Sequence, residues 1–197
     1  MLIGILLAVL QQITGINTVL YYAPEIFKSA GLGAADAIVQ TVIVGVVNIA
    51  FTIIAILVVD RVGRKPLLVA GSAGMGLSLF LLGRAFVLQQ FQGPWVLFYV
   101  LAYVASFAAA MGPVVWVILA EIFPTNVRGT AMSVATVALW ISCFMVTQFF
   151  PIMLEKLQGR AFFVYGVMCV VAVVFVAWFV PETKGKTLEE IEASWKV

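Results

Sequence analysis

Residues 11–24 combine side chains that can bind a polar ligand with a composition suited to a lipid bilayer. The stretch contains three amides, Gln11, Gln12 and Asn17, together with two threonines and two tyrosines, inside an otherwise apolar segment. A polar side chain in hydrocarbon is costly, and such residues are commonly functional. The stretch therefore predicts one wall of a polar binding site near the middle of a membrane. Hydrogen bonding between packed helices is the alternative.

The same stretch carries two residues that weaken a helix, Gly15 and Pro24. A broken membrane helix is tolerated where it is packed in protein or lines a cavity. An unbroken helix would place Gln12 and Asn17 about 140° apart around its axis. We expect a distortion near Gly15 to bring these two amides onto one surface.

The composition is that of a membrane protein. Hydrophobic residues make up 64% of the 197 positions and charged residues 10%, with a mean hydropathy of +1.16, whereas soluble domains have roughly 25% charged residues. The net charge of +2 is too small to indicate a nucleic-acid partner. The chain has no histidine, and Cys143 and Cys169 lie in apolar segments without a CxxC motif, so we expect no metal site, no cofactor and no disulfide. It also lacks the HExxH motif and the paired intramembrane carboxylates of a membrane-embedded enzyme.

Six segments are apolar and long enough to cross a bilayer. They are residues 2–27, 37–59, 67–89, 94–119, 130–154 and 161–180. Lys and Arg are divided seven to four between the two ends of these spans, which places the C-terminus in the cytoplasm of a multi-pass protein of the cell (inner) membrane. The chain enters hydrocarbon at Leu2 without a basic flank, so we expect it to be a piece of something longer.

Further polar and aromatic residues lie deep in the other spans. In the second span Asn48 shares one helix face with Thr41 and Thr52, where it is either a ligand contact or an interhelical hydrogen bond. The fourth span is expected to bend at Gly112–Pro113, three residues before Trp116. Trp140, in the fifth span, is too deep for the interfacial belt of tryptophans, and suits a ligand-stacking surface or helix packing.

Four motifs, in order along the whole chain, resemble the sugar porter family of the major facilitator superfamily. The first is the amide stretch with its tyrosines and proline, residues 11–24, which is similar to the family's seventh transmembrane helix. The others are the DRVGRKP loop at 60–66, the EIFPTNVRG loop at 121–129 and the PETKGKTLEE segment at 181–190. The resemblance covers the C-terminal six helices of a twelve-helix fold.

The resemblance implies roles for residues that match the family's motifs. Those expected to line a sugar site are Gln11, Gln12, Asn17, Asn48, Trp116 and Trp140. Tyr21 and Tyr22 match an aromatic pair that helps to close the extracellular side. An intracellular ion-pair network that holds the two halves together when the site faces outward is expected from Arg64, Glu121, Arg128 and Glu182. A positive-inside anchor with solvated charges is the alternative for this last group.

Two departures from the family leave the identity of the sugar open. Leu139 stands where the family often has a polar amide before the tryptophan, and Ala108 stands where the glucose transporters have an acidic residue. We therefore expect a pentose or a hexose, such as D-xylose or D-glucose. Proton symport is favoured by similarity to proton-linked members of the family, although no acidic side chain lies near the middle of any span.

The sequence as a whole predicts an all-α membrane protein. Residues 1–180 are expected to form the C-terminal six-helix bundle of a sugar transporter, built as a 3+3 inverted repeat, and residues 181–197 a cytoplasmic tail. A missing N-terminal six-helix half is the expected partner, beside the monosaccharide and the lipid bilayer. The alternatives are a proton-independent uniporter, and a truncated or split half-transporter without activity of its own.

Overall fold

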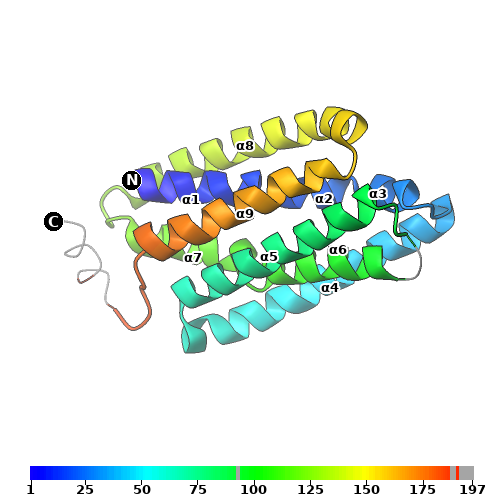
Figure 1. The fold of residues 1–197 in the computed structure, drawn as a ribbon. Helices are drawn as coiled ribbons and strands as arrows, with labels where there is room; N and C mark the ends of the chain where they lie inside the picture. The colour runs from blue at the N-terminus through cyan, green and yellow to red at the C-terminus, as the bar shows by residue number, and fades with distance from the viewer. Residues whose placement is uncertain (92–93, 187–189, 191–197) are drawn as a thin grey trace.

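The computed structural model describes residues 1–91, 94–186 and 190, and within these the regular secondary structure is α-helical (Figure 1). The helices of this part are α1 (Leu2–Ile13), α2 (Ile16–Tyr21), α3 (Ala23–Ser29), α4 (Ala34–Val62), α5 (Arg64–Val87), α6 (Trp95–Ala108), α7 (Met111–Ile122), α8 (Arg128–Leu157) and α9 (Arg160–Phe179). Residues 187–189 and 191–197 of the predicted tail lie outside the described residues.

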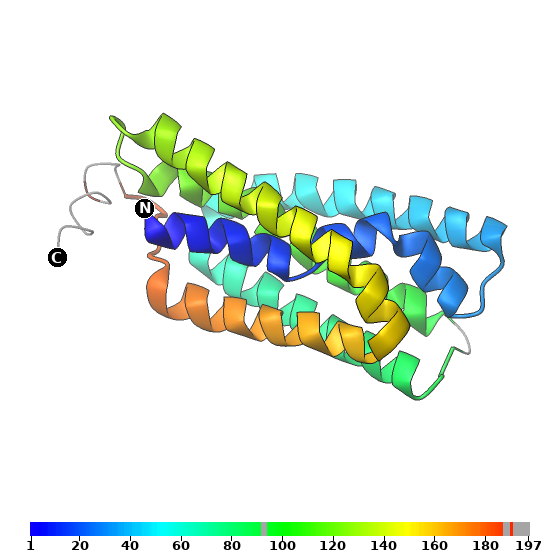
Figure 2. The same cartoon turned by 90° about the horizontal axis from the view of Figure 1, so that it is seen from above.

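Six helical segments are long and apolar enough to cross a membrane, which confirms the predicted number. They are Leu2–Tyr21, Ala34–Val62, Arg64–Val87, Trp95–Ile122, Arg128–Leu157 and Arg160–Phe179. They run alternately up and down one elongated bundle (Figures 1 and 2). We call the end that holds the α4–α5 turn, the α7–α8 connection and the end of α9 the tail end. The α3–α4, α5–α6 and α8–α9 connections lie at the opposite end.

The first span is broken at Gly15, as its composition predicts. Gly15 separates α1 from α2 with φ +92°, a left-handed conformation that favours glycine. A Cβ atom at this position would lie 2.8 Å from the ring of Tyr165 on α9. Glycine is therefore favoured at this position for two reasons: its backbone conformation and the close approach of an aromatic ring.

The fourth span is also broken, but two to three residues earlier than we predicted. α6 ends at Ala108 and α7 begins at Met111, so the prediction of a bend at Gly112–Pro113 was wrong in its position. Pro113 lies in the first turn of α7, where helical N–H groups have no intrahelical partner and a proline is tolerated. The helix must break ahead of that turn, since the ring would clash with the carbonyl four residues before it.

Small residues on α5 allow it to pack closely against α6 and the start of α7. A Cβ on Gly71 would overlap the Cβ of Ala110, and one on Gly74 would lie 2.6 Å from Oγ of Ser106. Close approach of this kind is how helices associate in lipid, where burial of apolar surface gives no advantage. The bundle is thus fixed around α5, which lies between α6 and α9.

Replacing Gly15 by alanine is predicted to destabilise the bundle. The left-handed backbone alone costs an L-residue about 1–2 kcal/mol, and the contact with Tyr165 adds to it, so the apparent melting temperature in detergent should fall. Gly31→Ala is the matched control, because Gly31 has φ +90° but no atom within 4 Å of an added Cβ. Equal losses in the two variants would contradict a role for the Tyr165 contact.

Candidate functional site

The three amides of the first span form one hydrogen-bonded chain across the break. Asn17 Nδ2 donates to Oε1 of Gln12 over 2.7 Å, and Gln12 Nε2 donates to Oε1 of Gln11 over 3.2 Å. Gln11 Nε2 donates to the backbone carbonyl of Met111 over 2.7 Å. The expectation that a distortion at Gly15 brings Gln12 and Asn17 together is therefore confirmed.

Other residues hold the broken backbone in place. The Thr14 hydroxyl donates to the carbonyl of Gln11 over 2.8 Å, and the buried Tyr103 hydroxyl donates to the carbonyl of Thr14 over 2.9 Å. These contacts matter because an unsatisfied carbonyl in hydrocarbon costs several kcal/mol. Tyr103 comes from α6, so the break is stabilised from a helix distant in sequence.

The amides differ in how much hydrogen-bonding capacity they retain. Gln11 and Gln12 are 2% and 5% exposed and bonded to their neighbours. Asn17 is half-buried, and its Nδ2 also lies 3.2 Å from Sγ of Cys143 on α8. Its Oδ1 accepts no hydrogen bond from the described residues. The arrangement therefore presents an acceptor from Asn17 at the edge of a buried amide chain.

The structure leaves the other predicted wall residues open rather than paired. Asn48, on α4, is half-buried, and its side chain forms no hydrogen bond within the described part of the chain. Trp116, on α7, is 37% exposed, and Trp140, on α8, is 56% exposed. No hydrogen bond joins these three side chains to the amide chain among the described residues. They therefore have faces available to a ligand or to a second bundle.

The two predicted gating tyrosines differ in their surroundings. Tyr21 ends α2 and is exposed. Tyr22 turns toward α8, where its ring packs 5.3 Å from that of Phe150 and its hydroxyl lies 3.5 Å from the carbonyl of Thr147. Tyr22 thus links the end of the first span to α8, and Tyr21 does not.

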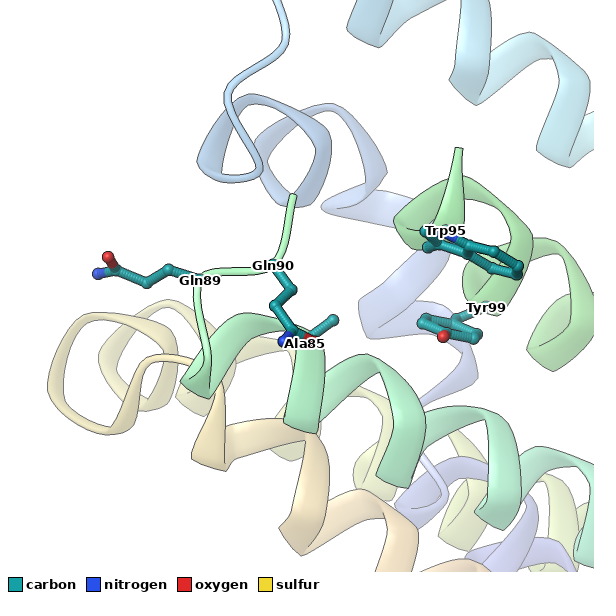
Figure 3. A pocket seen from close by; sticks show the side chains of 5 residues that line it. All are labelled: Ala85, Gln89, Gln90, Trp95 and Tyr99. Carbon is teal, nitrogen blue, oxygen red and sulfur yellow. The ribbon is translucent and has the colours of Figure 1, made fainter. Parts of the chain in front are cut away.

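A cavity that the sequence did not predict opens at the end opposite the tail. It has a volume of about 480 Å³ and is lined by Ala85, Gln89, Gln90, Trp95 and Tyr99. Figure 3 shows the rings of Trp95 and Tyr99, stacked with centroids 6.3 Å apart, facing the α5–α6 connection. The four-residue spacing of the two aromatics was the available signal. The cavity does not include the amides of the first span.

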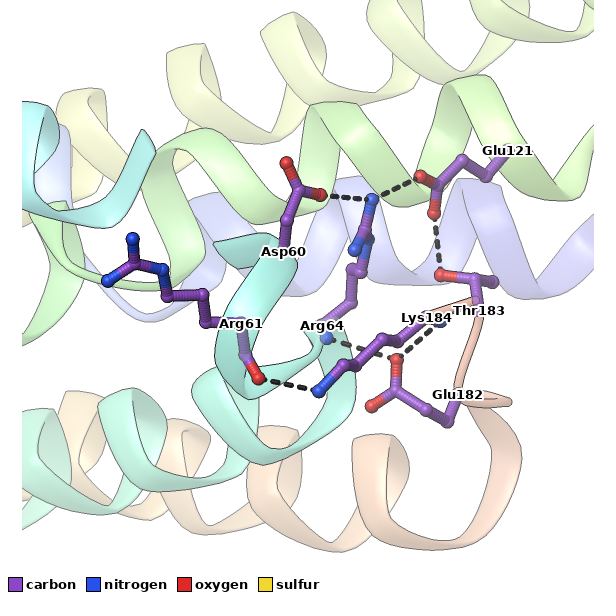
Figure 4. Close-up of polar contacts among 7 residues, drawn as sticks. All are labelled: Asp60, Arg61, Arg64, Glu121, Glu182, Thr183 and Lys184. Carbon is purple, nitrogen blue, oxygen red and sulfur yellow. Dashed lines mark hydrogen bonds and ion pairs between the residues drawn. The ribbon is translucent and has the colours of Figure 1, made fainter. Parts of the chain in front are cut away.

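The ion pairs at the tail end are centred on Arg64. Its Nη2 lies 2.8 Å from Oε1 of Glu121 and 2.9 Å from Oδ1 of Asp60 (Figure 4). Asp60 was missing from the predicted network, although it lies only four residues before Arg64, across the α4–α5 turn. Thr183 also donates to Oε2 of Glu121. The network therefore joins α4, α5, α7 and the start of the tail.

Glu182 belongs to this cluster in a different way, by capping α5. Its two carboxylate oxygens each accept a backbone N–H, from Arg64 and from Lys65, over 3.1 Å. A Cβ on Gly63, which has φ +102°, would lie 2.8 Å from the carboxylate. Burial alone would raise the pKa of Glu182, but backbone N–H donors, including that of Lys184, outweigh it and lower the pKa below its ordinary value.

Arg128 forms no ion pair or hydrogen bond with Arg64, Glu121 or Glu182 in the part of the chain that the structure describes. It is the first residue of α8, and its Nε donates back to the carbonyl of Phe123 over 3.2 Å. Its Nη2 is buried and has no partner among the described residues. The prediction grouped Arg128 with Arg64 and Glu121, whereas the structure uses it to close the α7–α8 connection.

The sequence model described as "Sugar (and other) transporter" matches residues 1–195. This chain therefore belongs to that family, and with its six apolar helices it is a multi-pass membrane protein. The family is one of transporters and not of enzymes.

Several curated proteins are similar to almost the whole chain. The D-xylose-proton symporter of Escherichia coli (strain K12) is 48% identical over 98% of this chain and 41% of its own length. The glucose facilitated diffusion protein of Zymomonas mobilis is 42% identical over 98% of this chain and 42% of its own. The chain thus spans about two fifths of the length of these relatives.

The fold agrees with solved structures of such carriers. The proton:xylose symporter of the major facilitator superfamily bound to 6-bromo-6-deoxy-D-glucose gives a TM-score of 0.90 at 48% identity, over 99% of this chain and 42% of that one. An inward open conformation of the xylose transporter from E. coli gives a TM-score of 0.89 at 47% identity. The six helices therefore have the arrangement found in part of a major facilitator fold.

The cap formed by Glu182 predicts a pH-dependent stability. Since its folded-state pKa is lowered, ionised Glu182 stabilises the structure above its unfolded value of about 4.3, and this contribution is lost as the pH falls through the folded pKa. Glu182→Gln should lower the apparent melting temperature at pH 7, and the difference from wild type should shrink toward pH 3. Glu155→Gln, an exposed carboxylate at the opposite end, is the control. A Glu182→Gln difference that is constant with pH would contradict the cap.

Proposed function

We propose that this chain is the C-terminal six-helix half of a carrier that moves a monosaccharide across the cell (inner) membrane by alternating access. The observation that supports it most is the amide chain across the Gly15 break, inside a membrane span of a sugar transporter family member. The sugar is held at a wall formed by Gln11, Gln12, Asn17, Asn48, Trp116 and Trp140.

In the proposed wall, the amides form hydrogen bonds with the sugar and the tryptophans stack against it. Asn17 and Asn48 have unused amide atoms, which can donate to and accept from sugar hydroxyls. The exposed faces of Trp116 and Trp140 pack against the apolar C–H face of a pyranose. Binding between helical bundles near the bilayer midplane is the usual design of such carriers.

Gln11 acts in this proposal as a positioning residue. It is almost fully buried and its donor is used by carbonyls of the α7 start, at 2.7 Å for Met111 and 3.3 Å for Gly112. Its oxygen in turn holds Gln12. Gln11 therefore fixes the orientation of the amides that follow it.

Proton symport is the coupling we propose, since two related carriers bear that description: the xylose symporter of E. coli and the arabinose-proton symporter of Bacillus subtilis, which is 41% identical to this chain. The chain has no acidic side chain at mid-span and no histidine, so the groups that titrate would belong to the N-terminal half. The similarity to a facilitated diffusion protein makes a uniporter the alternative. A pentose or a hexose fits the wall.

The tail-end ion pairs are proposed to latch the two halves. We propose that Arg64 and Glu121 meet loops of an N-terminal half. The Arg64–Glu121 ion pair and the bond of Glu182 to the start of α5 support this by holding the charges together at the tail end. The seven-to-four division of basic residues supports a cytoplasmic location for this end. Arg128, with one buried unpaired nitrogen, is available to a carboxylate of the partner half.

A second candidate is a half-transporter that has no transport activity alone. It is favoured by the fact that the chain covers only 41% of the length of the xylose symporter. In that case, the proposed wall would be one side of an incomplete site.

The proposal predicts separate effects on binding and stability. With a co-expressed N-terminal half, Asn48→Ala should weaken D-xylose or D-glucose binding roughly 3- to 10-fold without lowering the melting temperature, because its side chain has no partner to lose within the described residues. Gln11→Ala should lower both. Isothermal titration calorimetry and thermal unfolding measure the two effects.

Gln148→Ala is the matched control for these variants, since Gln148 is an exposed amide on α8. Sugar affinity unchanged in both Asn48→Ala and Gln12→Ala would refute the proposed wall. Binding by the chain alone, equal to that with the N-terminal half present, would refute the half-site.

A further inference from the structure

A basic pocket lies at the α8–α9 turn, away from the amide wall and the tail end. It has a volume of about 370 Å³, and its polar lining comes from Lys156, Gln158 and Arg160. Neither cation forms an ion pair with a carboxylate in the part of the chain that the structure describes. The neighbouring residue Glu155 is exposed, and its side chain leaves α8 about 100° around the helix axis from that of Lys156. Two cations and an amide facing one pocket suit a phosphate group.

An apolar groove runs down the same pair of helices, toward the middle of the bundle. Its volume is about 310 Å³, and its walls include Met145, Phe149 and Met153 on α8 and Val164 and Met168 on α9. Unbranched methionines adapt their shape to a flexible partner. In a membrane protein, the partner available to such a groove is an acyl chain.

The basic pocket and the groove follow the same stripes of both helices. On α8, Met153 and Phe149 lie three and seven residues before Lys156, and on α9 Val164 and Met168 lie four and eight residues after Arg160, spacings that place them on one helix face. Figure 2 shows α8 and α9 converging where they join.

We call the basic pocket and the apolar groove together the α8–α9 seam. The length of this seam matches one leaflet of a bilayer. Met145 and Lys156 are eleven residues apart, a rise of about 16 Å along a helix, close to half of the roughly 30 Å hydrocarbon core. A ligand that fits both parts must carry an anionic head and an apolar tail of about that length.

We propose that the α8–α9 seam binds one phospholipid of the leaflet at the end opposite the tail. Its phosphate lies between Lys156 and Arg160, and one acyl chain follows the groove. A free phosphate would leave the groove unfilled, and a lipid without phosphate would leave both cations unpaired.

The acyl chain would reach the break in the first span. Tyr165 and Ile13 also line the groove, and the ring of Tyr165 lies against Gly15. A lipid in the seam therefore packs against the ring that closes the Gly15 break.

Native mass spectrometry of the purified chain tests this site with dioleoyl-phosphatidylglycerol as the probe. We expect Lys156→Gln and Arg160→Gln each to weaken lipid retention about fivefold, and the double variant roughly 25-fold, if each cation near the headgroup contributes as basic residues at membrane surfaces do. Lys28→Gln, which removes an exposed cation at the same end but outside the pocket, should leave retention unchanged. Val164→Trp should displace the lipid by filling the groove while both cations remain.

Two further probes separate the sources of affinity. Inorganic phosphate at millimolar concentration should not displace the lipid, and dioleoylglycerol, which has the tails without the phosphate, should be retained as weakly as the phospholipid is by the double variant. Displacement by inorganic phosphate, equal retention of dioleoylglycerol and phospholipid, or a double variant no different from Lys28→Gln would each overturn the proposal.

Discussion

The structure depends on a broken helix whose backbone polar groups are satisfied inside a membrane. At Gly15 the first span leaves the helical path, and hydrocarbon offers no water to the carbonyl groups that this releases. Tyr103 supplies a donor to Thr14 from α6, and Gln11 bonds to the first turn of α7. The break is therefore held by helices from the other half of the chain, and the alignment of Gln12 with Asn17 follows from it.

The tail end solves a related problem, the free N–H groups at the start of α5. Gly63 makes the sharp α4–α5 turn with a positive φ, and the carboxylate of Glu182 takes the first two N–H groups of α5. A negative charge there also complements the positive end of the helix dipole. Because Thr183 bonds to Glu121, the same tail segment also contacts the ion pair of Arg64. Folding of the tail start and ordering of the ion pairs are thus coupled.

Features that depend on residues close together in the sequence could be predicted, whereas contacts between residues far apart in the sequence could not. The six spans follow from local hydropathy, and the Gly15 break from a glycine among polar residues, so both were predictable. The acceptor of Gln11 lies 100 residues away on α7, and the cap of Lys65 by Glu182 spans 117 residues; no local pattern encodes these pairs. The orientation of Arg128, whose Nε donates to the carbonyl of Phe123, was not predictable either, because a motif does not show which way a guanidinium turns. The bend before Pro113 was misplaced because a proline disturbs the turn before it.

The helices differ in how much of their surface is buried, and the residues of the proposed wall differ in the same way: some are buried and hydrogen-bonded, and others are exposed. In the most apolar stretch of the first span 56% of the residues are buried, whereas in α4 and α8 the share is only 17% each. The stretch in α4 has the highest mean hydropathy of the six, 3.0. Asn48 and Trp140 lie on these two uncovered helices, and Gln11 and Gln12 lie on the covered one. Side chains that hold the break are paired within the chain, whereas the side chains of Asn48 and Trp140 form no hydrogen bond with the described residues. The bundle therefore fixes the geometry of its amides by itself, and leaves the side chains of Asn48 and Trp140 beside them partly exposed.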